Sequence, residues 1–415
     1  MKALRHLLFH LGVAMPVVYG AIHNLFVGNL FTPAAIYALE FNDETNNFRI
    51  VQNHTADASH AWITFDVSIP HLNRPVVHFL TPSQHDKKNI YATSLNKSRI
   101  ASYSVKNATA IELIKTIPAS GACLNTTSAF ISAMPTAPYY AFSGSWPGPR
   151  ACGMSFSVDS DGTLSGVLDS WSYANTSGIH GLALSPLATT AATPNEQLVY
   201  SADLNGDAIW THAINLTTGL ARPSSQFPMP FSGMHPRHLA AHPSGRYLYA
   251  VMEADNSLAQ FSLSPTAAGN ITAETARHML IPTETNTTDF WSAEVMLSPS
   301  ARYLWATARA KTNETTGFIS VFLLAEDGAV LRRMFRVPTT TLGGWANAIA
   351  PAPWSDEYAV MTDYPLGYVQ VWKLEGGRER TEDGGGRVRE YTGAKPVARV
   401  DVGDGGCCAN AIWYS

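Results

Sequence analysis

The chain has 415 residues, of which 46% are hydrophobic and 14% are charged, so it carries ample apolar material for a large core. Its 28 lysines and arginines nearly balance its 32 aspartates and glutamates, and the basic residues form no long run. This balance argues against nucleic acid or an anionic membrane as a partner. Beyond the N-terminus, no stretch approaches the roughly 18 uninterrupted apolar residues of a membrane-spanning helix.

The first 20 residues have the pattern of a secretory signal peptide. The basic residues Lys2, Arg5 and His6 precede an apolar stretch at 7–18, and residues 18–20 offer small side chains for cleavage. A buried N-terminal strand is the alternative interpretation. We expect residues 1–20 to be removed and residues 21–415 to form a secreted, extracellular protein.

Potential N-glycosylation sites support this interpretation. The motif Asn-x-Ser/Thr begins at Asn53, Asn96, Asn107, Asn125, Asn175, Asn215, Asn270, Asn286 and Asn313. Most of these sites lie beside turn residues, as is typical of glycosylated surface loops. The motifs and the N-terminal pattern therefore both predict a secreted glycoprotein.

A repeat of about 56 residues dominates the remainder of the chain. Short apolar strands that end at proline recur at 180–186, 237–243, 293–299 and 347–353. Second strands follow at 197–203, 246–253, 302–309 and 357–363, and third strands at 257–263 and 368–374. Fainter copies begin near His60 and Ala129. Several short strands in each unit, over about seven units, predict an all-β, seven-bladed β-propeller.

The two ends of the chain predict how the ring closes. Residues 409–414 copy the opening of the preceding unit at 346–350, and the chain then stops. The mature N-terminus begins instead in mid-unit, with a second strand at 25–28 and a third at 35–41. We therefore expect one domain in which a C-terminal inner strand pairs with N-terminal outer strands and removes exposed sheet edges. The glycine-rich segment 376–390 is predicted to be a flexible outer loop.

The four cysteines favour structural roles. Cys123 and Cys152 could form a disulfide in an oxidising compartment. A bond between the adjacent Cys407 and Cys408 would be strained, and the sequence does not determine the connectivity. Neither a zinc-like Cys/His spacing nor a dense calcium-binding loop is present, so we expect no metal and no cofactor. An oligomer is compatible with this sequence.

The repeat register identifies candidate functional residues. In a propeller, the segment that enters the innermost strand and the turn that leaves the second strand meet at one face of the central channel. The first set of equivalent positions contains His60, Ala129, His180, Arg237, Ala293, Asn347 and Asn410. The second set contains Leu95, Gly144, Asp203 or Leu204, Glu253, Arg309 and Asp363.

Four of these residues suit one chemistry. Arg237 and Arg309 can bind carboxylates in a two-point fashion, while His180 can exchange protons near neutral pH. Together with Glu253 they predict a pocket for a small anionic carboxylate. The alternatives are an ion pair between Arg237 and Glu253 that serves structure alone, and a His180 whose ring is satisfied by the backbone.

Other polar residues are interpreted structurally. His235, His238, His242 and Trp345 are expected to be packing or rim residues.

Several strings, in the same order along residues 24–415, resemble the fungal 3-carboxy-cis,cis-muconate lactonising enzyme (carboxy-cis,cis-muconate cyclase) family within the lactonase-type propellers. They are Gly178-Ile-His-Gly181, Tyr200-Ser-Ala-Asp-Leu204, Trp210-Thr-His212, His235-Pro-Arg237, Tyr247-Leu-Tyr-Ala-Val-Met-Glu-Ala254, Ala308-Arg-Ala310, Pro353-Trp-Ser-Asp-Glu357 and Asn410-Ala-Ile-Trp-Tyr414. The chain departs from the family at Trp345, where the family has histidine, and matches it poorly at 118–149.

The resemblance implies a metal-independent intramolecular lyase that lactonises 3-carboxy-cis,cis-muconate or a related polycarboxylate, a reaction of aromatic catabolism. It implies catalytic roles for His180, Arg237, Glu253 and Arg309, with Arg237 and Arg309 binding the substrate and either His180 or Glu253 donating a proton. Hydrolysis of another lactone, as in 6-phosphogluconolactonase, is one alternative. A non-catalytic secreted propeller that binds a small acid or a protein is another.

Overall fold

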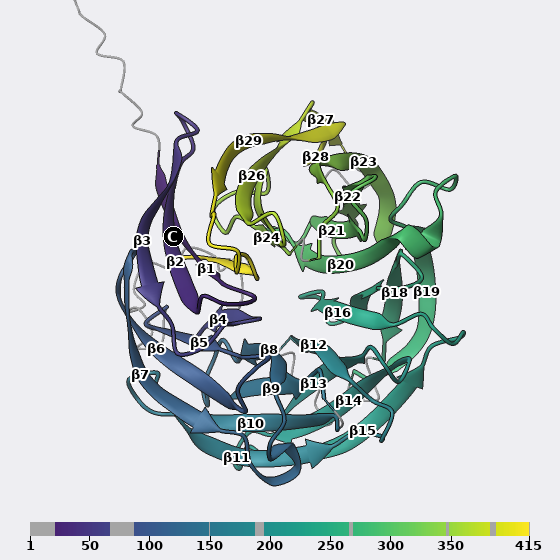
Figure 1. The fold of residues 1–415 in the computed structure, drawn as a ribbon. Coiled ribbons are helices and arrows are strands. Elements are labelled where there is room, and N and C mark those ends of the chain that lie inside the picture. Colours follow the sequence, from purple (N-terminus) through teal and green to yellow (C-terminus); the bar gives the residue numbers. More distant parts are fainter. Residues whose placement is uncertain are drawn as a thin grey trace, which may run out of the picture.

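The computed structural model describes residues 21–66, 87–148, 150–186, 195–264, 269–345, 348–381 and 387–414. The expected signal peptide at 1–20 lies outside these ranges. Seven four-stranded sheets surround a central axis, as Figure 1 shows, so the prediction of a seven-bladed propeller is confirmed. No helix in the described ranges is long and apolar enough to cross a bilayer.

In blades 1 to 6, four antiparallel strands follow one another in chain order from the central axis outwards. Blade 1 contains β4 (Ile63–Phe65), β5 (Asn89–Ala92), β6 (Arg99–Asn107) and β7 (Ala110–Pro118). Blade 2 contains β8 (Ser128–Ala133), β9 (Ala141–Ser145), β10 (Cys152–Val158) and β11 (Leu164–Ser172). Blade 3 contains β12 (Ile179–Leu184), β13 (Glu196–Asp203), β14 (Ala208–Asn215) and β15 (Ala221–Pro228).

The next blades have the same arrangement. Blade 4 contains β16 (Pro236–Ala241), β17 (Tyr247–Met252), β18 (Ser257–Leu263) and β19 (Ile271–Met279). Blade 5 contains β20 (Phe290–Leu297), β21 (Tyr303–Ala310), β22 (Thr316–Leu324) and β23 (Val330–Leu342). Blade 6 contains β24 (Ile349–Pro351), β25 (Tyr358–Asp363), β26 (Tyr368–Glu375) and β29 (Gly393–Asp401). Two short 3-10 helices, η1 (Gly121–Cys123) and η2 (Thr287–Asp289), lie in the connections.

Blade 7 joins the two ends of the chain. Its inner strand is β30 (Ala411–Trp413), and its outer strands are β1 (Ile22–Gly28), β2 (Ala35–Asn42) and β3 (Phe48–Thr55). Val27 faces Ala411 in the ladder between β1 and β30, where purple and yellow ribbons meet in Figure 1. The Asn410 side chain then accepts a hydrogen bond from the Ile63 amide at 2.8 Å, which ties blade 7 to blade 1. The predicted ring closure is confirmed.

The core lies between neighbouring blades, because both faces of each sheet pack against another sheet. Every residue of β21 is buried, whereas the outer strand β23 is largely exposed or half-buried. Trp305 of blade 5 and Trp372 of blade 6 share one apolar cluster. Strands buried on both faces lose the alternation of apolar and polar residues, which explains the continuous apolar runs of the repeat.

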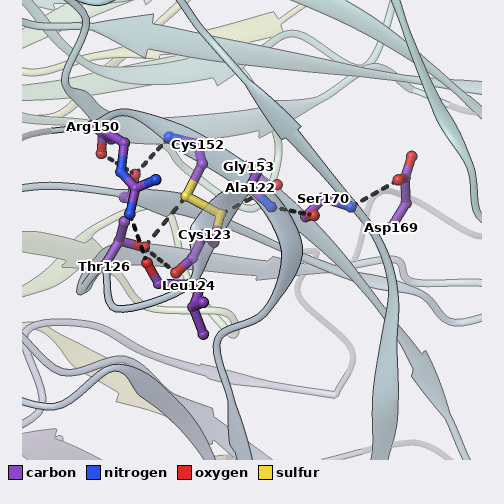
Figure 2. Close-up of a disulfide and its surroundings, with 10 residues drawn as sticks. Ala122, Cys123, Leu124, Thr126, Arg150, Cys152, Gly153, Asp169 and Ser170 are labelled. Carbon is purple, nitrogen blue, oxygen red and sulfur yellow. Dashed lines mark hydrogen bonds between the residues drawn. A yellow bond between two sulfur atoms is a disulfide. The ribbon is translucent and has the colours of Figure 1, made fainter.

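Two disulfides are present. Cys123 in η1 is bonded to Cys152 in β10, with their Cα atoms 5.4 Å apart, which is the pairing that the sequence allowed. Figure 2 shows the surrounding contacts, in which the Thr126 hydroxyl donates a hydrogen bond to the Cys123 carbonyl. The adjacent Cys407 and Cys408 are also bonded to each other, and both are buried. This pairing answers the question of connectivity that the sequence left open.

The segment 376–390 differs from the expected flexible loop. It contains a two-stranded hairpin of β27 (Arg378–Thr381) and β28 (Arg387–Glu390), with Arg378 opposite Glu390. Val388 is buried in the apolar cluster between blades 5 and 6, and Tyr391 packs beside it. The charged and glycine-rich composition gave no sign of these two apolar contacts, which pack this segment against blades 5 and 6.

Candidate active site

The innermost strands of blades 3, 4 and 5 carry β-bulges at equivalent repeat positions. The pairing of β12 shifts between Ile179 and Gly181 and leaves His180 outside the ladder. The pairing of β16 shifts in the same way around Arg237. In β20 the irregularity covers Ala293 and Glu294. A bulge redirects the side chain of its extra residue, which is how these strands present polar groups beside the central channel.

Arg237, Glu253 and Arg309 form a buried charge cluster across two blades. One oxygen of Glu253, Oε2, lies 2.9 Å from Arg237 Nε and 2.9 Å from Arg309 Nη2. The three side chains are only 9–12% exposed. Arg237 also donates a hydrogen bond from Nη1 to the carbonyl of Ala293. The indole ring of Trp291 lies 5.1 Å from the Arg309 guanidinium and adds a cation–π contact.

This charge cluster has a positive excess. Burial is the main effect that lowers the pKa of Arg237, and the Glu253 carboxylate opposes it. Burial and then the charge of Arg237 lower the pKa of Arg309 to about 9, again against the pull of Glu253. Both arginines are therefore charged at neutral pH, and they share one carboxylate. The cluster suits an additional anionic group.

His180 belongs to a second chain of polar groups. Its Nδ1 lies 3.0 Å from Nε2 of His238, and Nδ1 of His238 lies 2.7 Å from Oε2 of Glu294. Aromatic rings enclose this chain, with Trp146 at 4.9 Å from His180 and Trp62 at 5.0 Å from His238, measured between ring centroids. His180 thus has a side-chain partner in His238, in addition to a hydrogen bond with its own backbone.

Burial sets the protonation of these three groups. It lowers the pKa of both histidines well below the ordinary value, and the positive charges of Arg237 and Arg309 lower it further. Burial also raises the pKa of Glu294 to about 8, although the charge of Arg237 opposes this shift. At neutral pH both imidazoles are thus neutral, and burial favours the protonated form of Glu294.

Gly181 allows the two histidines to meet. A Cβ atom at this position would lie 2.4 Å from the carbonyl oxygen of Arg237 and 2.9 Å from Cα of His238. Any larger residue would therefore push β16 away from β12. The glycine that follows His180 is required by the close approach of these two strands.

Three other positions predicted from the repeat register make contacts with the surrounding backbone and side chains. His60 contacts the carbonyl of Thr93 at 2.8 Å and the hydroxyl of Tyr103 at 2.7 Å. Asp203 accepts hydrogen bonds from the amides of Gly178 and Gly206. The Asn410 side chain accepts a hydrogen bond from the amide of Ile63. Asn347 lies outside the described residues. Thus blades 3, 4 and 5 supply the charged and histidine side chains of this site.

Two polar residues of the site were missed at the sequence level. The sequence favours a packing or rim role for His238, but its ring bridges His180 and Glu294. Glu294 itself was not among the candidates. His238 directly follows Arg237, and Glu294 directly follows Ala293, so both occupy the same position of the repeat. In blade 3 this position, after His180, is a glycine. A polar residue at the equivalent position in blades 4 and 5 was the signal that could have revealed them. Elsewhere, His242 contacts Ser244 and the Ala301 carbonyl, and Trp345 is 53% exposed.

In the ranges that the structure describes, no group of three or more His, Cys, Asp or Glu side chains is arranged to hold a metal ion. Metal independence of the chemistry stays a prediction.

Comparison with known proteins identifies a lactonase family model and relatives named for the cyclisation of muconates. Residues 24–343 match the family model described as lactonase, 7-bladed beta-propeller. The chain is 29% identical over 407 residues to carboxy-cis,cis-muconate cyclase of Neurospora crassa, covering 95% of this chain and 99% of that protein. It is 30% identical over 187 residues to muconate cycloisomerase 1 of Cutaneotrichosporon cutaneum, covering 43% of this chain and 49% of that protein.

Solved structures show the same fold. The periplasmic gluconolactonase PpgL of Pseudomonas aeruginosa superposes with a TM-score of 0.68 at 17% identity, covering 95% of this chain and 99% of that chain. The family match covers well over half of the chain, and the ring of seven blades agrees with it. The chain belongs to the seven-bladed β-propeller lactonase family, and within it is a homologue of carboxy-cis,cis-muconate cyclase.

Proposed function

We propose that this protein is a lactonising cycloisomerase, an intramolecular lyase that acts on 3-carboxy-cis,cis-muconate or a related polycarboxylate. The observation that carries the proposal is the buried cluster in which Arg237 and Arg309 share the single carboxylate of Glu253. Such a cluster favours a substrate with carboxylate groups, and the Neurospora crassa relative is named for a cyclase of such a substrate.

The mechanism follows from the positions of the charges. Arg237 and Arg309 bind substrate carboxylates and hold one of them against the alkene, which gains from proximity. A carboxylate oxygen forms the C–O bond, and the π electron pair moves to the neighbouring carbon as enolate-like charge. The two guanidiniums stabilise that charge, and the carbon then takes one proton.

His180 suits the role of proton donor better than Glu253 does. Oε2 of Glu253 accepts from Arg309 at 2.9 Å and faces Arg237 Nε at the same distance, so this oxygen is already engaged by both guanidiniums. His180 is neutral, and its Nδ1 is engaged by His238. Its other ring nitrogen, Nε2, is therefore the group we assign to the substrate carbon.

The test is the ultraviolet absorbance of 3-carboxy-cis,cis-muconate incubated with the purified protein. We expect loss of the conjugated-diene absorbance and formation of one lactone, identified by mass spectrometry and NMR. An unchanged diene signal with folded protein would contradict the proposal. Screening of sugar lactones would then test the hydrolase alternative, and binding without turnover would indicate a non-catalytic propeller.

We also propose that the protein is secreted and N-glycosylated. The asparagines of seven of the nine motifs are exposed, and Asn215 and Asn270 are half-buried. Disulfides such as Cys123–Cys152 persist mainly in oxidising compartments. Both features support export.

Expression in a secreting fungal host should therefore yield glycosylated protein in the medium. An endoglycosidase should increase its gel mobility, and substitution of an exposed site, such as Asn175→Gln, should remove one glycan. Retention of the unmodified chain inside the cell, with an intact N-terminus, would contradict this prediction.

A further inference from the structure

Two buried groups at the site, His238 and Glu294, have no role in the proposed binding of substrate carboxylates by Arg237 and Arg309. The side chains of His238 and Glu294 are 3% and 2% exposed, so substrate cannot contact them as readily as it can Arg237 or Glu253. Burying a carboxyl and an imidazole costs free energy unless each has a partner. Their side-chain partners here are each other and His180, at 2.7 Å and 3.0 Å, and the amide of Val295 donates a hydrogen bond to Glu294 Oε1 at 3.1 Å.

We propose that Glu294 and His238 form a proton relay that sets the tautomer of His180 and supplies the proton that His180 gives to the substrate. This inference rests on the proposed lactonising function. Glu294 and His238 are positioning residues in this scheme, because they act on the substrate only through His180.

The geometry allows two arrangements of protons along the chain. When the Glu294 carboxyl is protonated, it donates to Nδ1 of His238, whose Nε2–H donates to Nδ1 of His180. The proton of His180 then lies on Nε2, ready for the substrate. When Glu294 is ionised it accepts from His238 Nδ1–H, both histidines take the other tautomer, and Nε2 of His180 carries only a lone pair.

The relay conserves protons over one catalytic cycle. As the substrate carbon takes the proton from Nε2 of His180, Nδ1 of His180 takes one from His238, and His238 takes one from Glu294. The imidazoles remain neutral at the end, and Glu294 is left as a carboxylate. A proton from water restores the starting state, which matches the single proton that lactonisation consumes.

The charged groups around the relay make this cycle feasible. Burial of the Glu294 carboxyl raises its pKa, while the Arg237 guanidinium on β16 and the hydrogen bond from the Val295 amide act in the opposite direction. Arg309 on β21 acts on both histidines, and Glu253 after β17 partly neutralises the two arginines. The balance raises the pKa of Glu294 to about 8, so the carboxyl can both lose and regain a proton near neutral pH.

The first test does not depend on turnover. In ¹⁵N-histidine-labelled protein, we expect the ring signals of His180 and His238 to change tautomer together in one step as the pH rises through about 8. Glu294→Gln should abolish this shared step, while Glu196→Gln, at an ion pair on the surface of blade 3, should leave it unchanged. Independent changes of the two rings, or the same step in Glu294→Gln, would overturn the relay.

The second test uses the lactonisation assay. We expect Glu294→Gln to lower kcat on the order of 10²-fold with KM nearly unchanged, because general acid catalysis contributes about that factor. The wild-type kcat should fall as the pH rises above about 8, and this alkaline decrease should be lost in the variant. His238→Gln should behave similarly, since it also interrupts the chain of proton transfers.

The outcomes separate the two proposals. Wild-type turnover with an equally active Glu294→Gln would refute the relay and leave the proposed function intact. Absence of turnover in the wild type would refute the proposed function, and the histidine titration would then decide the relay by itself.

Discussion

Replacing Arg237 with alanine should reduce kcat/KM for lactonisation on the order of 10³-fold, because a buried donor aimed at developing negative charge is worth about that factor. The side chain contacts Glu253 at 2.9 Å and, in the proposed mechanism, also binds a substrate carboxylate. The fold should survive, since Glu253 keeps its 2.9 Å contact with Arg309. The measurement is the loss of diene absorbance, with circular dichroism to verify folding.

Arg222→Ala is a matched control for this substitution. Arg222 also pairs with a glutamate, Glu196, but its side chain is 55% exposed and lies on the outer part of blade 3. We expect wild-type activity from this variant. Full activity of a folded Arg237→Ala protein would show that the buried cluster serves structure alone, which is the alternative that the sequence left open.

Glu253→Ala should destabilise the protein by about 3–5 kcal/mol, the usual cost of removing one partner from a buried ion pair. The Glu253 carboxylate is the shared partner of Arg237 and Arg309, which come from neighbouring blades. Without it, two guanidiniums would remain close together in a buried site. Their repulsion already contributes to the lowered pKa of Arg309.

Denaturant unfolding of the purified variants measures this effect. Glu196→Ala removes a comparable glutamate from an exposed pair, and we expect it to cost no more than about 1 kcal/mol. Equal stability of the two variants would mean that the two arginines do not depend on Glu253 for their charge balance. Partial rescue of Glu253→Ala by a dicarboxylate ligand would support the anion-binding role of the arginines.

The sequence by itself determined the architecture. A repeat of about 56 residues with several short strands is a local signal that each blade repeats, so the number of blades could be counted from the chain. The closure of the ring followed from the copy of an inner strand at 409–414 and the outer strands near the N-terminus. The register of the repeat also identified His180, Arg237, Glu253 and Arg309 as neighbours of the channel.

Only the tertiary structure decided how those neighbours are connected. The β-bulges at Ile179/Gly181 and Pro236/His238 shift the register by one residue, which a repeat alignment cannot resolve. Gly181 then lets β16 approach so closely that His238 reaches His180, and Glu294 completes the chain from the next blade. Likewise, Val388 packs a hairpin against the apolar cluster between blades 5 and 6, and the charged residues around Val388 in the sequence gave no indication of this contact. Contacts between separate blades depend on strand spacing in three dimensions, which the register of the repeat does not specify by itself.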